Sequence, residues 1–369
     1  MSARIAALET WIARYPVVGD FKYLRRAADG PVTRDTVVVK LTDDAGRSGW
    51  GQSVPSPTWS YETIETVSTT LTHHLGPALV GLDVDDTATV WRTMNRVIAN
   101  GFSTGQPIAK AGIDLALFDL VGRARGETPC QRWGADGKPN LTLSWTVDAR
   151  SIDEVAGTVA TALTRGYRAF NLKAGAGLES DLAIARELRR VVPGAFIWAD
   201  ANGAYDEASA VTLARTYADL GFAAFEQPLP ANRLPGYLTL KRMGALPILM
   251  DEGVVSLEDL RSFHQLGLLD GVAMKVSRSG GLTEARRMIA YLRDEGLHYF
   301  ASGLTDPDLA LAACLHLFAA TDLPHPAALN APQFLSGSIL ATPLVIHGDQ
   351  AYVPNGPGLG VDVAHLQPQ

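Results

Sequence analysis

The sequence predicts an α/β fold, in which parallel strands and helices alternate to form a barrel behind a separate α+β domain. The main observation is a series of charged residues in the second half of the 369-residue chain, each at the end of a short apolar run: Lys173, Asp200, Glu226, Asp251 and Lys275. They follow one another at intervals of 24 to 27 positions, about the length of one βα unit of an eight-unit barrel. Because the C-terminal ends of barrel strands meet at one mouth, we expect these side chains to converge there.

The residues before each charged position suit strands that are buried on both faces. These runs occupy residues 167–172, 195–199, 221–225, 246–250 and 271–274. Amphipathic stretches such as 181–192 and 208–220 carry apolar residues at helical spacing between them. Repeated alternation of strand and helix is typical of a parallel α/β fold.

The first third of the chain has a different order, with strands first and helices afterwards. Strands are expected at 5–15, 33–42 and 48–54, and helices at 61–75, 85–99 and 106–125. This order indicates an α+β domain over residues 1–126, ahead of a barrel domain over 127–332. A last segment, 333–369, returns to hairpin character at 344–347 and 350–353, and we expect it to pack back on the first domain.

Composition limits the classes of partner. The chain is 47% hydrophobic and 19% charged, as in a globular protein with a large core, and its net charge is −7 with a pI near 5.6. Such a charge disfavours nucleic acid and anionic membranes, so we expect a small-molecule partner. No apolar run is long enough to span a bilayer and the N-terminus lacks a signal-peptide core. Cys130 and Cys314 suit packing better than a disulfide framework, so a reducing cytoplasm is the expected compartment.

The charged series predicts a metal site. Three carboxylates facing one another repel unless a cation lies among them, and carboxylate oxygens are ligands that suit Mg²⁺. We therefore expect Asp200, Glu226 and Asp251 to bind Mg²⁺, with Lys173 and Lys275 on either side. The alternative is a purely structural cluster of salt bridges.

The motifs around these residues resemble the enolase superfamily, and within it the muconate lactonizing enzyme subgroup of the mandelate racemase/muconate lactonizing enzyme family. The matching segments are Ala199-Asp200-Ala201-Asn202, Glu226-Gln227-Pro228, Asp251-Glu252 and 275–282, together with 109–120 in the first domain. The resemblance covers almost the whole chain. It implies a modified TIM barrel, (β/α)7β, closed by the N-terminal α+β capping domain, and it implies homo-oligomers.

The resemblance also implies residue roles and a reaction class. Asp200, Glu226 and Asp251 would hold Mg²⁺, and Lys173 and Lys275 would act as acid and base on opposite faces of a substrate carboxylate. The common step is removal of the proton next to that carboxylate to give an enolate. This step is physically demanding because it places a second negative charge on an anion, which a divalent cation offsets.

The sequence departs from the subgroup at the second barrel strand, where Asn171 replaces the first lysine of the usual Lys-x-Lys motif. Residues two apart in a strand share a face, so Asn171 is expected beside Lys173 as a substrate-binding residue. Its amide can hydrogen-bond a substrate but supplies no positive charge. We expect Lys173 to keep a less depressed pKa than in a site with two lysines.

Further substrate contacts are expected from Asn202 and Asp306. Asn202 follows a metal ligand, and its alternative role is that of a turn or helix-cap residue. Asp306 aligns roughly with an acidic position of the family, and either it or Asp308 is expected to reach the substrate. Residues 328–332 lack the Asp-x-Asp of dipeptide epimerases, which disfavours that reaction.

Racemisation or epimerisation by two opposed lysines is the leading expectation for the reaction. The same enolate also permits loss of a β-hydroxyl, as in a dehydratase, or ring opening and closure, as in a cycloisomerase. A catalytically inactive relative that binds a metabolite is a third alternative. Specificity is expected to depend on capping loops near residues 15–30 and 54–60. Five aromatic residues suit either a specificity pocket or core packing: Tyr15, Phe21, Tyr23, Trp59 and Tyr61.

Overall fold

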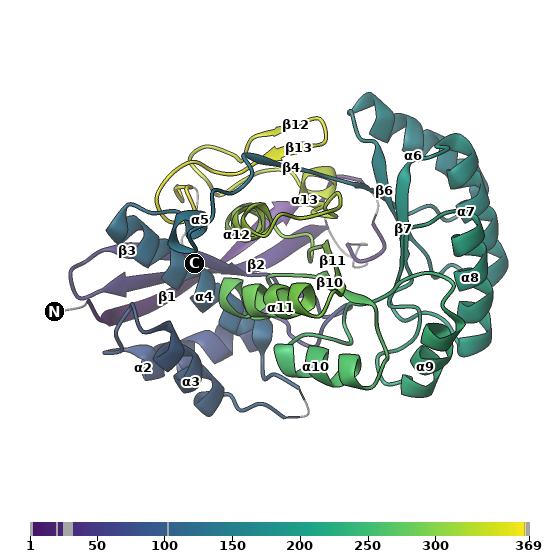
Figure 1. The fold of residues 1–369 in the computed structure, drawn as a ribbon. Helices are drawn as coiled ribbons and strands as arrows, with labels where there is room; N and C mark the ends of the chain where they lie inside the picture. Colours follow the sequence, from purple (N-terminus) through teal and green to yellow (C-terminus); the bar gives the residue numbers. More distant parts are fainter. Residues whose placement is uncertain (1–2, 20, 25–31, 102, 365, 367–369) are drawn as a thin grey trace.

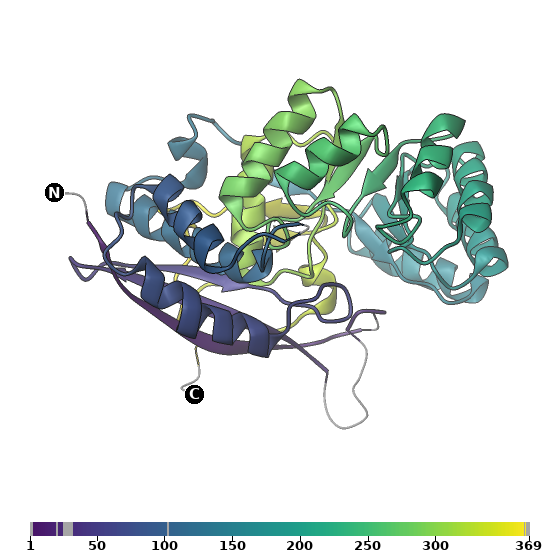
Figure 2. The same ribbon diagram turned by 90° about the horizontal axis from the view of Figure 1, so that it is seen from below.

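The computed structural model describes residues 3–19, 21–24, 32–101, 103–364 and 366. Its first part is an antiparallel sheet with the strand order β1-β2-β3, covered on one side by helices (Figures 1 and 2). The elements are β1 (Ile5–Pro16), β2 (Thr33–Asp43), β3 (Ser48–Ser53), α1 (Ile64–Thr69), α2 (Gly76–Leu79), α3 (Thr87–Val97), α4 (Pro107–Arg125) and α5 (Pro129–Arg132). The expected α+β order is therefore present.

Helix α4 packs closely against β3 because the strand carries glycine where the helix backbone approaches. A Cβ atom built on Gly51 would lie 2.1 Å from the carbonyl oxygen of Gly112 in α4. The helix is apolar nearly all round, and its residues 107–122 are buried. Helix α4 therefore forms the centre of the capping domain.

A helix is present where one was expected at 61–75, but it is not a single regular α-helix. It begins at Ile64, widens into a π-helical turn over Thr70–Leu75, and continues as the short α2. Pro77 in α2 has no backbone N–H to donate to the preceding turn, which favours this local widening.

The second part is a curled parallel sheet with the order β11-β10-β9-β8-β7-β6-β5 (Figure 1). Its strands are β5 (Trp145–Val147), β6 (Ala169–Lys173), β7 (Phe196–Asp200), β8 (Phe225–Glu226), β9 (Ile248–Met250), β10 (Gly271–Met274) and β11 (His298–Ala301). Its helices are α6 (Ile152–Thr164), α7 (Leu178–Val191), α8 (Glu207–Asp219), α9 (Leu234–Met243), α10 (Leu257–Gln265), α11 (Leu282–Asp294) and α12 (Asp308–Ala320).

The sheet closes into a barrel through the segment Ala327–Ala328. Ala328 bridges Ser302 beyond β11, and Ala327 bridges Leu143 ahead of β5, both in parallel. This segment stands where an eighth strand belongs, so the described chain forms the expected (β/α)7β barrel. Large side chains fill the barrel interior: Trp198, Leu249 and Phe300 pack together with Ala224 and Ala328.

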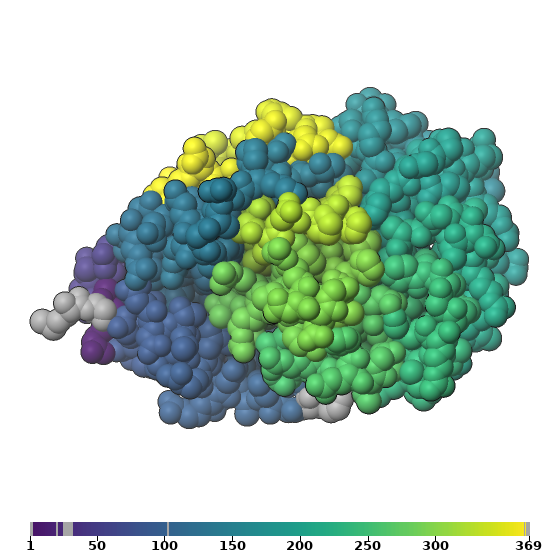
Figure 3. All heavy atoms as spheres, in the orientation of Figure 1, coloured from purple at the N-terminus to yellow at the C-terminus, as the bar shows by residue number. Residues whose placement is uncertain are grey.

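The C-terminal segment joins both parts of the molecule. It contains α13 (Ala331–Phe334) and a hairpin of β12 (Ile346–His347) and β13 (Gln350–Tyr352), and β13 pairs with β4 (Asn140–Thr142). Beyond the hairpin, the backbone N–H of Leu359 donates to Asp119 of α4 at 2.8 Å. Figure 3 shows the C-terminal residues, in yellow, lying directly against the segment around β4.

The capping domain meets the barrel at the turn after Lys275. A Cβ atom on Gly281 would lie 2.6 Å from Asp114 Oδ2 of α4, and this glycine has a φ of 107°. Asp114 in turn accepts hydrogen bonds from the backbone and hydroxyl of Thr283 and from Trp91 Nε1. The turn therefore needs glycine both for its conformation and for this contact. Among the helices that the structure describes, none is long and apolar enough to cross a membrane.

Candidate active site

The five charged residues of the periodic series converge at the mouth of the barrel. Lys173, Asp200 and Glu226 end β6, β7 and β8, and Asp251 and Lys275 directly follow β9 and β10. Each is at most 5% exposed. Oxygen atoms of the three carboxylates lie within 4.8 Å of one another. Because β6 and β10 are four positions apart in a ring of eight, the two lysines enter from opposite sides with the carboxylates between them.

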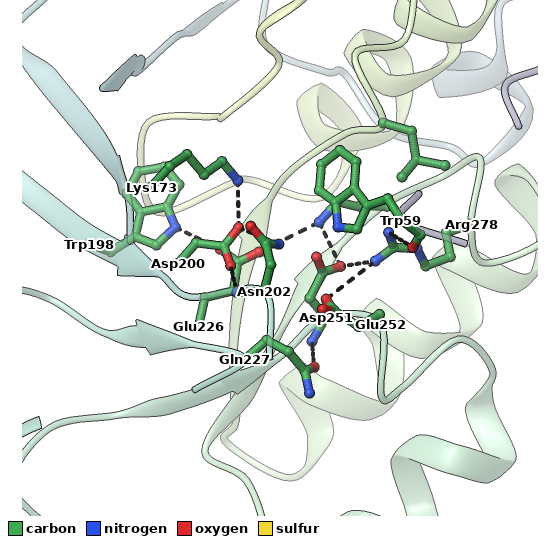
Figure 4. Close-up of polar contacts among 12 residues, drawn as sticks. Trp59, Lys173, Trp198, Asp200, Asn202, Glu226, Gln227, Asp251, Glu252 and Arg278 are labelled. Carbon is green, nitrogen blue, oxygen red and sulfur yellow. Dashed lines mark hydrogen bonds and ion pairs between the residues drawn. The ribbon is translucent and has the colours of Figure 1, made fainter. Parts of the chain in front are cut away.

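Each lysine makes an ion pair with these carboxylates. Lys173 Nζ lies 2.5 Å from Asp200 Oδ2, and Lys275 Nζ lies 2.6 Å from Asp251 Oδ1 and 3.5 Å from Glu226 Oε1. Figure 4 shows Lys173 and Asp200 facing each other on one side of the site and Asp251 on the other. The lysines therefore touch opposite ends of the carboxylate cluster.

Neighbouring polar groups fix the orientation of the carboxylates. Trp198 Nε1 donates to Glu226 Oε2 at 2.9 Å, and Asn202 donates to Asp200 through its backbone N–H at 2.9 Å and its Nδ2 at 3.1 Å. Gln227 Oε1 accepts the backbone N–H of Asp251 at 2.9 Å. Asn202 and Gln227 both have positive φ angles, of 48° and 38°. Such conformations cost energy and often occur beside functional sites.

The electrostatics of the cluster suit a divalent cation. Burial, followed by the Asp200 carboxylate, raises the pKa of Glu226, and burial with the Asp251 carboxylate raises the pKa of Glu252 well above its usual value. Asp251 Oδ2 and Glu226 Oε1 have no hydrogen-bond partner among the described residues. The site therefore contains buried carboxylate oxygens that accept no hydrogen bond from the described residues. Such oxygens are ligands that suit Mg²⁺.

The pKa of Lys173 lies above its ordinary value. Burial acts to lower this pKa, but the carboxylates of Asp200, Glu226 and Asp251 and the hydrogen bond to Asp200 outweigh it. That this pKa is less depressed than in a site with two lysines stays a prediction. Neutralising the carboxylates would remove the interaction that holds the amine protonated.

Trp59 from the capping domain lies over the cations of the site. Its ring centroid is 5.3 Å from Lys173 Nζ, 5.0 Å from Lys275 Nζ and 5.2 Å from Arg278 Cζ. The ring also stacks on Tyr23 at 4.5 Å, and Figure 4 shows it beside Arg278. Both aromatic residues were expected either in a specificity pocket or in a core, and the structure places them at the mouth. Part of the expected capping loop, residues 20 and 25–30, lies outside the described residues.

Three further residues of the same site had no role assigned from the sequence: Arg278, Glu252 and Lys22. Arg278 pairs with Asp251 and donates to the carbonyl of Trp59 at 3.2 Å. Lys22 donates from Nζ to Ala174 O at 2.8 Å, and burial lowers its pKa. Arg278 and Glu252 lie within the segments 275–282 and Asp251-Glu252 that match the family, and these matches could have identified them. No such signal exists for Lys22, because its position depends on the conformation of a loop.

The three expected substrate contacts fall in different surroundings. Asn171 is buried on the inner side of β6, and its Nδ2 has no described partner. Asn202 Nδ2 is used by Asp200, while its Oδ1 has no described partner. Asp306 accepts from Ser277 Oγ at 2.6 Å and from the Leu304 N–H at 3.0 Å, so its carboxylate supports a loop. Asp308 instead accepts from Tyr15 of the capping domain.

Comparison with known proteins places this site in a family. The enolase C-terminal domain-like family matches residues 154–366, and the mandelate racemase/muconate lactonizing enzyme N-terminal domain matches residues 24–131. Muconate cycloisomerase 1 of Rhodococcus opacus is 26% identical over 366 residues, covering 97% of this chain and 96% of that protein. Chloromuconate cycloisomerase of Pseudomonas sp. strain P51 is 29% identical over 324 residues, covering 86% and 85%.

A relative with a different reaction aligns over a similar share of the chain. The L-Ala-D/L-Glu epimerase of Bacillus subtilis is 25% identical over 367 residues, covering 98% of each protein. Its substrate-liganded structure has a TM-score of 0.89 and covers 98% of this chain and 99% of that chain. These relatives are enzymes of several activities on one fold. With both family domains matched in sequence order, the chain belongs to the mandelate racemase/muconate lactonizing enzyme family of the enolase superfamily, in its muconate lactonizing enzyme subgroup.

Proposed function

We propose that the chain is a Mg²⁺-dependent enzyme that moves the proton next to the carboxylate of a small-molecule substrate, through an enolate. The observation that carries the proposal is the placement of three buried carboxylates between two lysines that enter from opposite sides of the mouth. Asp200, Glu226 and Asp251 would hold the ion. When bound, Mg²⁺ supplies positive charge that offsets the charge developing on the substrate carboxylate.

The two lysines supply the proton transfers in this proposal. Lys173 and Lys275 flank the space above the carboxylates, so each amine faces one side of a substrate held there. One amine accepts the α-proton, and either the same or the opposite amine returns a proton to the α-carbon. Trp59, above both amines, excludes water from the reacting side and packs on the substrate.

Cycloisomerisation has the better support among the reactions that share this enolate. Muconate and chloromuconate cycloisomerases are among the relatives that span most of the chain. In such a reaction a proton is added to, or removed from, the α-carbon as a carboxylate oxygen bonds to, or leaves, the neighbouring carbon. This ranking differs from the expectation drawn from the sequence, which placed racemisation first.

Epimerisation is the second candidate, and one structural observation favours it. Inversion needs a proton donor on the face opposite the base, and the lysines on β6 and after β10 stand on opposite sides. The L-Ala-D/L-Glu epimerase of Bacillus subtilis, which aligns with 98% of this chain, also supports this candidate.

Exchange of the α-proton with D2O tests the proposed function. The full chain with Mg²⁺ is incubated with a panel of small carboxylates, and NMR records α-deuterium, inversion and ring closure. We expect exchange in the wild type, and a loss of roughly 100-fold or more in Lys173→Ala and in Lys275→Ala. For a chiral acid, each variant should retain some exchange only for the enantiomer whose proton faces the remaining lysine.

Lys241→Ala is the matched control, because this lysine pairs with Asp270 ahead of β10, away from the mouth. It should exchange like the wild type. Exchange that survives unchanged in both active-site lysine variants, or no exchange of any acid in the wild type, would contradict the proposal. Retention without inversion would leave cycloisomerisation and remove epimerisation.

A further inference from the structure

The barrel mouth is divided into a charged half and a neutral half. Strands β6 to β10 carry the lysines and carboxylates already described. The remaining positions of the ring, β11, the Ala327–Ala328 segment and β5, present Ser302, Asn330 and Thr146, which are all neutral and buried. A substrate whose carboxylate lies over the charged half would extend toward this neutral half.

Thr146 and Asn330 of the neutral half form one cluster with Asn171, which lies on the adjoining strand β6. Asn171 on β6 is the register partner of Thr146 on β5, so their side chains share the inner face. Asn330 Nδ2 lies 3.3 Å from Thr146 Oγ1. The backbone of Thr146 is held on both sides by Gln333, which accepts its N–H at 2.9 Å and donates to its carbonyl at 2.8 Å. The cluster is therefore fixed in place.

Two polar atoms of this cluster have no hydrogen-bond partner among the residues that the structure describes. They are Asn171 Nδ2, a donor, and Asn330 Oδ1, an acceptor, and the residues are 1% and 5% exposed. Leaving a buried polar atom unpaired costs on the order of 1–3 kcal/mol, and functional sites are a common reason for that cost. One unpaired donor on β6 and one unpaired acceptor beyond the Ala327–Ala328 segment, with β5 between them, complement a group that itself offers an acceptor and a donor.

The charges around the cluster disfavour a second carboxylate there. Lys22, which the capping domain brings to this side, donates to Ala174 O, and its backbone N–H donates to Asp148 Oδ2 at 2.6 Å. Arg34, near Asp306, donates hydrogen bonds to backbone carbonyls, including that of Leu304 at 2.7 Å. The cations nearest Asn171 are thus already engaged, Lys173 by the Asp200 carboxylate and Lys22 by Ala174 O. A second anion beside Asn171 would compete with these contacts and would also meet the Asp148 carboxylate.

We infer that Asn171 and Asn330 form a subsite for an uncharged amide of the substrate, whose carbonyl accepts from Asn171 Nδ2 and whose N–H donates to Asn330 Oδ1. The inference rests on the proposed function, since it places the reacting carboxylate over the charged half. It holds for either reaction that follows the enolate. It makes the substrate a carboxylate that carries an amide, in place of a dicarboxylate.

Binding of matched pairs of acids tests the inference without turnover. Isothermal titration calorimetry of the Mg²⁺-saturated full chain compares succinamate with succinate, glutaramate with glutarate, and adipamate with adipate. The members of each pair differ only in whether the far end is an amide or a carboxylate. In the pair that binds most tightly, we expect the amide to bind roughly tenfold or more tightly than the diacid.

Variants assign the preference to the cluster. Asn171→Leu and Asn330→Leu remove the two polar ends with little change in volume, and each should bring the ratio within a pair to about 1. Asn171→Lys should reverse it in favour of the diacid. Asn355→Lys, at an exposed position near the C-terminus, adds the same charge elsewhere and should keep the wild-type ratio.

The outcomes separate the two proposals. Equal affinities, a preference of the wild type for the diacid, no binding of any pair, or a ratio that survives both leucine variants would overturn the amide subsite. Proton exchange in D2O without an amide preference would overturn the subsite alone. An amide preference in a chain that exchanges no α-proton would overturn the proposed function alone.

Discussion

At the scale of single residues, the site combines side chains that a sequence pattern can predict with others that it cannot. The convergence of the three carboxylates and two lysines was predicted because barrel geometry brings regularly spaced strand ends to one mouth, and the structure brings all five together. Trp59 and Lys22 reach the same place from the capping domain. Their positions depend on loop conformation, which no period in the sequence encodes.

Trp59 gives the first testable consequence at this scale. Trp59→Ala removes an aromatic ring about 5 Å from each lysine, and we expect KM for the substrate found by exchange to rise roughly tenfold, about 1.4 kcal/mol, with a smaller change in kcat. Trp59→Phe keeps a ring and should lie between the two. Steady-state kinetics measure both constants, and an unchanged KM in the alanine variant would remove Trp59 from the site.

At the scale of elements, the strands could be predicted from the sequence, but the group that caps a helix could not. A buried parallel strand is a short apolar run, and this signal is local. The start of α4 at Pro107 was expected to within one residue, but the group that caps it was not, because its N-cap residue, Gln106, makes no side-chain cap. Glu62, from a loop distant in sequence, accepts instead from the N–H groups of Ile108 at 2.8 Å and Ala109 at 2.9 Å. Only the tertiary structure reveals such a cap.

Glu62 makes stability depend on pH in a defined direction. Burial raises the pKa of Glu62 from 4.5 to about 7. Since the folded-state pKa is above the unfolded one, the folded state binds the proton more tightly, and this contribution is present below pH 4.5 and is lost as pH rises through about 7. We therefore compare the free energy of unfolding of Glu62→Gln with that of the wild type. The difference, variant minus wild type, should rise by about 3 kcal/mol between pH 4.5 and 8.

Denaturant unfolding across this pH range measures the difference, with Glu65→Gln as control. Glu65 is exposed in the first turn of α1, so its variant should follow the wild-type pH profile from pH 4.5 to 8. A difference between Glu62→Gln and the wild type that does not change with pH would show that Glu62 is not buried as a titrating cap.

At the scale of the whole molecule, one aspartate connects the capping domain, the barrel and the C-terminal segment. Asp308, at the start of α12, accepts from Tyr15 of β1 at 2.9 Å, and from Ser338 Oγ and the Ile339 N–H at 2.8 Å each. The sequence placed Asp308 among candidate substrate contacts, because its neighbours are polar and lie near a strand end. Its partners lie 30 or more positions away, so the sequence alone could not separate the two roles.

Removing this connection should destabilise the whole chain. Asp308→Ala leaves buried donors without an acceptor, and we expect the free energy of unfolding to fall by roughly 3 kcal/mol. Asp308→Asn keeps part of the bonding and should lose less. Chemical denaturation measures both, with Asp294→Ala on the exposed side of α11 as a neutral control. A stability of Asp308→Ala equal to that of the control would contradict a joining role.

The central claim is that the carboxylates of Asp200, Glu226 and Asp251, at the ends of three successive strands, bind one divalent cation. Metal titration tests this claim most directly. Calorimetry with Mg²⁺ or Mn²⁺ should give one ion per wild-type chain, and the substitutions Asp200→Asn, Glu226→Gln and Asp251→Asn should each weaken binding roughly tenfold or more. Glu258→Gln, on the exposed face of α10, should bind like the wild type. Wild-type protein that binds no ion, or binding that all three substitutions leave unchanged, would contradict the account.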